Sequence, residues 1–334
     1  MRDPVTDFEY PEEWVRACRS EEDRSLAASG LGVLTSSGKV LRRGYTTGTT
    51  AAAAAKAAIL SLRSPVSSVE IRLPCGLTVT MPVRSEDGSA VCTKDAGDHP
   101  RDVTAGVEIH ARAERSAGSI RIEAGEGIGR FARDVPGHRK GYPAVSEPAM
   151  ACILSEAKKG ALLAGIPGAV VTLSVPEGKT LAPQTLNPQV GVLGGISILG
   201  TTGLVEPWDD HLAESVRERV AAADRPVITT GRIGLRFARM RYPDRDVILA
   251  GGRIAEALDA ARGPVTLFGL PGLILRFLDP SFLEGTGCAT VAELLMRPEF
   301  VQRMQDAVDR FRASHPRVTV VIVDRKGRVL GETP

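Results

Sequence analysis

The chain has 334 residues, a net charge of +2, 43% hydrophobic residues and 4% aromatic residues. This composition is that of a globular protein with two domains, since one domain typically holds roughly 100–200 residues. The small charge and the scarcity of rings for base stacking argue against nucleic acid as a partner. No apolar run reaches the roughly 18–20 residues that span a membrane. The acidic N-terminus is unlike a secretory or transit signal, so we expect a cytoplasmic protein.

The cysteines and histidines are too scattered for a metal site or a disulfide framework. The five cysteines contain no C-x-x-C pair, and the five histidines contain no H-x-x-x-H pair. Metal sites and disulfide frameworks are recognised by such spacings. We therefore expect no protein-bound metal, and we expect buried thiols in a reducing compartment.

The first half of the chain predicts an α+β domain. Residues 1–40 predict a surface helix and a short hairpin, as an extension that precedes this domain. An alanine-rich helix follows, and then short strands, among which Val107–Arg112 alternates like a half-buried antiparallel strand. A helix is predicted over Glu147–Leu163 and a strand over Ala169–Val175. We expect residues 41–190 to form an α+β domain with a mainly antiparallel sheet.

The second half predicts a different architecture. Strands alternate with helices here, which indicates a parallel sheet with crossover helices. A long helix is predicted around Thr290–Ala313. We expect residues 191–334 to form an α/β Rossmann-like domain, with the boundary within Asn187–Gly194. The predicted strands are Val227–Thr230, Asp246–Ala250, Val265–Phe268 and Val318–Val323.

Leu41–Ala58, called here the threonine segment, is the most informative stretch. A basic pair and a glycine–threonine turn precede a run of alanines, which favour helix. Threonine hydroxyls can cap the free N–H groups at a helix start. The same free N–H groups beside Arg42 and Arg43 can bind an anion. The pattern leaves a capped helix and an anion site equally open. Lys56 is either a lysine that extends to the surface or a ligand contact.

Gly194–Trp208, the glycine segment, predicts a second site. An apolar strand runs into a Gly-Thr-Thr-Gly loop. In open α/β sheets, ligands bind at loops that follow the carboxyl ends of strands. Glu206 could bind the two hydroxyls of a ribose, whereas a tight turn between domains is the alternative. The candidate ligand contacts are Gly194, Gly195, Ser197, Gly200, Thr201, Thr202, Gly203 and Glu206.

Two further segments carry candidate residues. Lys94–Asp102, the charged segment, follows a strand and offers Asp95, Asp98 and His99 for acid–base chemistry. Turns favour aspartate and glycine in any case, so a simple turn is the alternative. Gly125–Gly129 resembles a dinucleotide fingerprint, but the helix that this fingerprint requires does not follow. We interpret it as a loop that closes over a substrate, with a solvated basic loop as the alternative.

Together these segments resemble the CbiD family in its archaeal-type branch. The likeness extends from about Leu41 to Trp208 and thins beyond it. Thr50 stands where many members carry cysteine, so a thiol is not essential at this position. The strings that carry the resemblance are Gly44–Thr49 before the alanine helix, Lys94–Asp98, Gly194–Pro207, the Gly125 loop and Glu147-Pro148.

The resemblance implies methylation of C-1 of cobalt-precorrin-5B to cobalt-precorrin-6A in anaerobic cobalamin biosynthesis. S-adenosyl-L-methionine would be the methyl donor, and cobalt would enter only within the tetrapyrrole substrate. The donor is expected on the glycine segment, on the side of residues 191–334, and the substrate on the side of residues 41–190. Asp95, Asp98, His99 or Glu206 would transfer protons. Cationic groups and helix starts suit the carboxylates of the substrate. The candidate substrate contacts are Arg42, Arg43, Tyr45, Thr46, Thr47, Gly48, Thr49, Thr50, Lys56, Lys94, Gly125, Gly127 and Gly129.

Two other functions stay open. Small-molecule kinases also run a Gly/Ser-rich loop into an alanine-rich helix, so Gly44–Ala58 could hold ATP with Asp95 as base. The order of residues in the kinase loop is absent here. The third interpretation is a non-catalytic module that binds a tetrapyrrole or another anion. The sequence leaves the oligomeric state open, and a homodimer is compatible with it.

Overall fold

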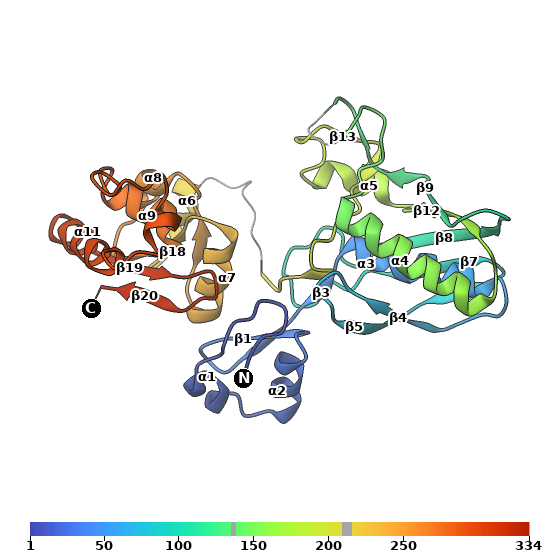
Figure 1. Cartoon of the computed structure of the whole chain (residues 1–334), viewed down its shortest axis with the longest axis horizontal. Helices are drawn as coiled ribbons and strands as arrows, with labels where there is room; N and C mark the ends of the chain where they lie inside the picture. Colours follow the sequence, from blue (N-terminus) through green and yellow to red (C-terminus); the bar gives the residue numbers. More distant parts are fainter. Residues whose placement is uncertain (135–137, 209–215, 334) are drawn as a thin grey trace. The chain divides into compact units, whose positions relative to one another are not determined.

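The computed structural model describes residues 1–134, 138–208 and 216–333 (Figure 1). The chain forms two compact units, one of Arg42–Asp209 and one of Met1–Leu41 together with Asp210–Pro334. The fold is mixed α/β, with mainly antiparallel strand pairs in the first unit and a mostly parallel sheet in the second. No helix in the described ranges is long and apolar enough to cross a membrane.

A five-stranded sheet forms the frame of the 42–209 unit (Figure 1). Its order is β6-β7-β8-β12-β9, and every neighbouring pair is antiparallel except β12 and β9. Side chains alternate between buried and exposed along β7, as expected for a sheet with one covered face. The strands are β6 (Arg84–Glu86), β7 (Ser89–Thr93), β8 (Glu108–Arg115), β9 (Arg121–Ala124) and β12 (Ala169–Ser174).

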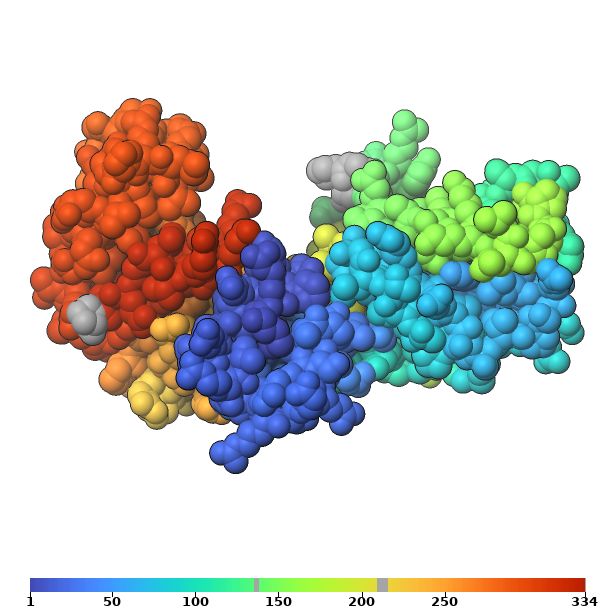
Figure 2. All heavy atoms as spheres, turned by 60° about the horizontal axis from the view of Figure 1, so that its bottom comes forward, coloured from blue at the N-terminus to red at the C-terminus, as the bar shows by residue number. Residues whose placement is uncertain are grey.

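The buried face of this sheet is covered by α3 (Thr47–Ser61), which packs against β7, β8 and α4 (Glu147–Ala164). The alanines of α3 are fully buried, because their small side chains let a sheet and a second helix approach the same helix. Gly160 serves the same end, since a Cβ there would lie 3.2 Å from the Lys56 carbonyl oxygen. Helix α4 lies on the surface of the unit and exposes Leu162 and Leu163 (Figure 2).

Short strand pairs complete this unit and fix where the glycine segment lies. Within the glycine segment, β14 pairs with β10 and β15 pairs with β3. Just before the segment, β13 pairs with β11. The expected domain boundary at Asn187–Gly194 therefore falls inside the unit. The bounds are β3 (Gly44–Tyr45), β4 (Ser68–Arg72), β5 (Thr78–Pro82), β10 (Gly127–Ile128), β11 (Arg130–Phe131), α5 (Gly178–Leu181), η1 (Ala182–Gln184), β13 (Val192–Leu193), β14 (Gly195–Ile196) and β15 (Leu204–Val205).

The other unit is built on a sheet of order β17-β16-β18-β19-β20. The first four strands are parallel, and β20 returns antiparallel to β19. One face buries an apolar core under α6, α8, α9, α10 and α11, and α7 packs beside β16, β17 and β18. The strands are β16 (Val227–Thr229), β17 (Val247–Leu249), β18 (Val265–Gly269), β19 (Val318–Val323) and β20 (Val329–Glu332). The helices are α6 (Val216–Ala222), α7 (Arg232–Arg241), α8 (Ile254–Ala260), α9 (Pro271–Leu278), α10 (Val291–Leu294) and α11 (Phe300–Ser314).

The N-terminal residues belong to this second unit and are not a free surface extension. The Phe8 ring lies 5.2 Å from that of Phe237, and the Ser36 N–H donates to the Met240 carbonyl at 2.8 Å. The predicted hairpin is present as β1 and β2. The predicted helix is two helices, and the elements are α1 (Glu12–Ala17), α2 (Glu21–Ala28), β1 (Gly32–Leu34) and β2 (Val40–Arg42).

Candidate functional site

The threonine, charged and glycine segments meet at the N-terminal end of α3, although they lie far apart in the sequence. Tyr45 pairs with Leu204 across β3 and β15, and its N–H donates to the Asp95 carbonyl at 2.7 Å. Arg43 forms a β-bridge with Gly97. One place in the fold therefore contains three of the strings that carry the family resemblance.

Glycines allow the three segments to cross at backbone distance. A Cβ on Gly44 would lie 2.2 Å from the Ala96 carbonyl carbon, and one on Gly200 would lie 2.6 Å from the Thr46 hydroxyl oxygen. Gly97 has φ +62°, and its Cβ would lie 2.4 Å from the Arg42 carbonyl oxygen. These positions require glycine for packing between protein segments, whatever ligand the site binds.

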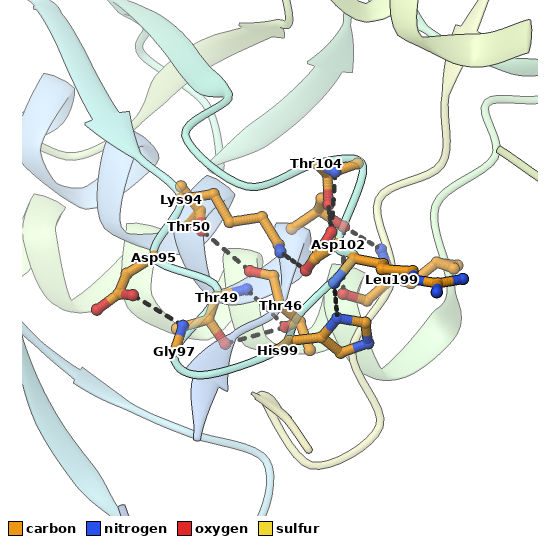
Figure 3. A network of polar contacts seen from close by, with 12 residues as sticks. Thr46, Thr49, Thr50, Lys94, Asp95, Gly97, His99, Asp102, Thr104 and Leu199 are labelled. Atoms are coloured by element: carbon orange, nitrogen blue, oxygen red, sulfur yellow. Dashed lines mark hydrogen bonds and ion pairs between the residues drawn. The ribbon is translucent and has the colours of Figure 1, made fainter. Parts of the chain in front are cut away.

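The threonine hydroxyls hold the glycine segment against α3 (Figure 3). The Thr46 hydroxyl caps the helix by accepting from the Thr49 N–H at 3.2 Å, and the Thr49 hydroxyl donates to the Gly203 carbonyl at 2.7 Å. The Leu199 N–H donates to the Thr47 hydroxyl at 2.8 Å. Of the two interpretations of this helix start, the structure shows the capped helix, and an anion-binding role stays a prediction.

Other polar groups of these segments also have protein partners. The Thr50 hydroxyl donates to the Thr46 carbonyl at 3.0 Å, and the Gly48 N–H donates to the Leu199 carbonyl at 2.8 Å. In the glycine segment, the Ser197 hydroxyl donates to the Asn187 side-chain oxygen at 3.0 Å, and this bond holds the segment to residues that precede it in the chain. Thr201 is exposed, whereas the Thr202 hydroxyl bonds to the Leu204 backbone, and Gly203 adopts φ +88°.

Arg42 and Asp95 form a two-pronged ion pair at the edge of the site. One of its two hydrogen bonds measures 3.1 Å, and the Arg42 side chain remains 45% exposed. Burial raises the pKa of Asp95, but hydrogen bonds from Arg42 and from the Gly97 N–H outweigh it, so that the pKa is lowered. Burial, followed by the charge of Asp95, raises the pKa of the half-buried Tyr45 phenol. The pair keeps a guanidinium fork within reach of solvent.

The other two predicted cations of the site are buried and paired. Lys94 is 2% exposed and forms an ion pair with Asp102, whose carboxylate also accepts from Thr104. Arg43 is fully buried and lies 3.5 Å from the Glu206 carboxylate, measured from Nε to Oε2. Burial raises the pKa of Asp102, but hydrogen bonds from Lys94 and Thr104 outweigh it, so that the pKa is lowered. These pairs fix the shape of the site.

Two acid–base candidates of the charged segment accept hydrogen bonds from backbone N–H groups. The Asp98 carboxylate accepts from the Arg42 N–H at 2.7 Å, and Nδ1 of His99 accepts from the Arg101 N–H at 3.2 Å. Asp98 is exposed and His99 is partly buried, so both can reach a solvent-borne ligand. Their role in proton transfer stays a prediction.

Lys56 lies inside the unit, not at its surface. Its ammonium donates to the Glu156 carboxylate at 2.8 Å and to the Glu70 carbonyl at 2.6 Å. The Glu156 side chain is 1% exposed and is also bound by Lys159. Burial raises the pKa of Glu156, but hydrogen bonds from Lys159 and Lys56 outweigh it, so that the pKa is lowered. The surface interpretation of Lys56 is wrong, because its charge joins α3 to α4.

The Gly125–Gly129 segment contains the two-residue strand β10 (Gly127–Ile128) and is held by close backbone packing, and its closing over a substrate stays a prediction. Gly127 pairs in parallel with Gly195, and a Cβ on Gly127 would lie 1.8 Å from the Val175 carbonyl oxygen. A Cβ on Gly129 would lie 2.4 Å from the Val192 side chain. Residues 135–137 of the adjoining basic stretch lie outside the described residues.

The N-terminal ends of α3 and α4 lie side by side, which the sequence did not indicate. A Cβ on Gly48 would lie 2.8 Å from that of Ala149, and the Ser146 N–H donates to the Ile198 carbonyl at 2.9 Å. Within the described ranges the Ser146 hydroxyl oxygen is buried without a hydrogen-bond partner. Both helix dipoles therefore direct their positive ends toward the same edge of the unit, where anions are favoured.

The site contains no cluster of His, Cys, Asp or Glu side chains able to hold a metal ion, as far as the described residues extend. The cysteines Cys92 and Cys152 are buried, and burial raises the pKa of Cys92 to about 12 and that of Cys152 to about 11. These thiols stay protonated and are poor nucleophiles or ligands.

Comparison with known proteins places these features in a family. The CbiD family model matches residues 34–207. The chain is 54% identical to a protein of Methanoregula boonei and 53% identical to one of Methanoculleus marisnigri, each over the whole length of both chains. Both relatives are named cobalt-precorrin-5B C(1)-methyltransferase. The crystal structure of a cobalamin biosynthesis protein (CbiD) from Archaeoglobus fulgidus is 35% identical, with a TM-score of 0.58 over 97% of this chain and 100% of that one. The chain belongs to the CbiD family.

Proposed function

We propose that this chain is a cobalt-precorrin-5B C(1)-methyltransferase, which forms cobalt-precorrin-6A on the anaerobic route to adenosylcobalamin with S-adenosylmethionine as methyl donor. The observation that carries the proposal is the meeting of the three family segments at one end of α3. Full-length identity to relatives that bear this name supports the same reaction.

In this reaction the main task of the protein is to position the methyl donor against the acceptor carbon. An electron pair of the macrocycle forms the new bond to the methyl carbon, and the pair of the broken carbon–sulfur bond stays with sulfur. The macrocycle is itself the nucleophile, so a covalent enzyme intermediate is not needed. Alignment of donor and acceptor can supply about 7–11 kcal/mol of such a barrier.

The substrate carboxylates would bind at the joint N-terminal edge of α3 and α4. Two parallel helix dipoles attract anions there, and Arg42 of the threonine segment offers a guanidinium that is 45% exposed. A substrate carboxylate would replace Asp95 on the Arg42 fork. Arg43 and Lys94 are too deeply buried for direct contact, and they would hold the surrounding segments in place. Asp98 and His99 would handle protons as the ring conjugation changes.

The methyl donor is the second ligand that the reaction requires. Its predicted place on the glycine segment rested on a loop that follows a strand of the parallel sheet, whereas the segment belongs to the 42–209 unit. The parallel order of β17, β16, β18 and β19 supports a Rossmann-like role for the other unit, with the donor bound there.

The test is to incubate the purified protein with cobalt-precorrin-5B and S-adenosylmethionine and to measure the mass of the product by mass spectrometry. A product heavier by one methyl group, together with S-adenosylhomocysteine, is expected. Tetrapyrrole binding without turnover would favour the non-catalytic module. Magnesium-dependent ATP binding without S-adenosylhomocysteine binding would favour the kinase.

A further inference from the structure

The parallel sheet has a point where its strand order reverses. The chain passes from β16 to β17 on one side, and then returns to place β18 and β19 on the other side of β16. The loops that leave β16 and β18 therefore run in opposite directions. Sheets of this kind bind ligands in the crevice that opens between two such loops at the carboxyl ends of the strands.

The loops after β16 and β18 touch at their base and are open above it. A Cβ on Gly269, the last residue of β18, would lie 3.1 Å from the Thr230 hydroxyl oxygen. Gly231 and Gly272 differ, because a Cβ on either would have no described atom within 4 Å. Gly231 precedes α7, and Gly272 lies in the first turn of α9. Two glycine-lined helix starts thus face open space.

Neither helix has a side-chain cap from the residue that precedes it. The residues before α7 and α9 are Gly231 and Leu270, and neither provides a side-chain cap for the free N–H groups. The helices have 10 and 8 residues. Free N–H groups at a helix start bind carboxylates and phosphates.

A buried hydroxyl beside α7 points to a ligand independently. Thr229, the last residue of β16, is 0% exposed, and among the described residues its hydroxyl oxygen has no hydrogen-bond partner. A Cβ on Gly234, in the first turn of α7, would lie 3.8 Å from the Cβ of Thr229. Buried polar groups are nearly always satisfied, so this hydroxyl points to a hydrogen-bond partner that the described residues do not supply.

We propose that this crevice between the loops after β16 and β18 binds the methyl donor. The N-terminal turns of α7 and α9 and the Thr229 hydroxyl are its polar contacts. The proposal rests on the proposed function, which requires S-adenosylmethionine, a nucleoside that carries an amino-acid carboxylate. It moves the donor away from the glycine segment, where Gly200 packs against Thr46 and the Gly203 carbonyl accepts from the Thr49 hydroxyl.

The proposal is tested by titration calorimetry of the full chain with S-adenosylhomocysteine. Gly231 has φ −163°, an extended conformation that valine adopts, so Gly231→Val fills the open space without backbone strain. Binding at least about tenfold weaker is expected for Gly231→Val. Thr229→Val should bind about fivefold weaker, the effect of one hydrogen bond. Its melting temperature should not fall, because the variant loses an unpaired buried hydroxyl.

The matched control is Thr201→Ala in the exposed loop of the glycine segment, which should bind like the wild type. Wild-type affinity in both Gly231→Val and Thr229→Val would overturn the placement, as would weaker binding in Thr201→Ala alone. If Gly231→Val weakens the binding of the tetrapyrrole but not of S-adenosylhomocysteine, the crevice is a substrate site and the proposal fails. No binding of S-adenosylhomocysteine by the wild type would contradict the proposed function itself.

Discussion

Replacing Glu156 with alanine would leave the Lys56 ammonium buried between α3 and α4 without its carboxylate. The two side chains are 9% and 1% exposed, and the Glu70 carbonyl is the other acceptor that Lys56 reaches. Breaking a buried ion pair by removing one partner costs about 3–5 kcal/mol. We expect Glu156→Ala to lower the free energy of unfolding of the 42–209 unit by about 3 kcal/mol, because the Glu70 carbonyl keeps part of the compensation.

The assay is denaturant unfolding followed by the fluorescence of Trp208, which is 7% exposed within this unit. A Trp14→Phe background removes the other tryptophan, which lies outside the unit. Lys159→Ala is the control, since it deletes the exposed partner of Glu156 and should cost less than about 1 kcal/mol. Replacing both partners of the buried pair, in a Lys56→Met/Glu156→Leu variant, should recover most of the loss. A loss below about 1 kcal/mol in Glu156→Ala would refute the reasoning.

Three further predictions concern the candidate site. Gly127→Ala should prevent or severely impair folding, because its Cβ would collide with the Val175 carbonyl oxygen. Gly165 has the same positive φ but no described atom near its Cβ position, so Gly165→Ala should lower the free energy of unfolding by only about 1–2 kcal/mol, as measured by thermal unfolding. Arg42→Lys should raise KM for the tetrapyrrole about tenfold with an unchanged melting temperature, because lysine lacks the guanidinium fork; an unchanged KM would exclude Arg42 from substrate binding. The lowered pKa values of Asp95 and Asp102 mean that their ion pairs stabilise the fold above the ordinary aspartate pKa and are lost as pH falls through the lowered values. The melting temperature should therefore fall below about pH 4, and Asp102→Asn should flatten that fall; an equally steep fall in the variant would contradict this assignment.

Local sequence signals predicted the longer elements well. The helix predicted over Glu147–Leu163 is α4, which ends one residue later, and the strand predicted over Ala169–Val175 is β12. The helix expected around Thr290–Ala313 is two helices, α10 and α11, with Pro298 between them. Proline disfavours helix in the residue before it, so this break had a signal in the sequence.

Long-range pairing was not predictable in the same way. The strands that join the glycine segment to the first unit are two residues long, and so short a strand has no periodicity to detect. The sequence identified Lys94 and Lys56 as candidates but not their partners Asp102 and Glu156. The Lys56 partner lies 100 residues away, where only the packing of α3 on α4 brings it into contact. The charged residues could therefore be named from the sequence, but not which of them remain open to a ligand.

The most direct test of the account is to follow a carbon-13 methyl group from S-adenosylmethionine onto cobalt-precorrin-5B by nuclear magnetic resonance. The wild type should place the label on C-1 of the macrocycle, and Arg42→Lys should do so only at higher substrate concentration. A label on another carbon, or a macrocycle that stays unlabelled while the folded protein binds both substrates, would contradict the assignment of this chain as a C-1 methyltransferase.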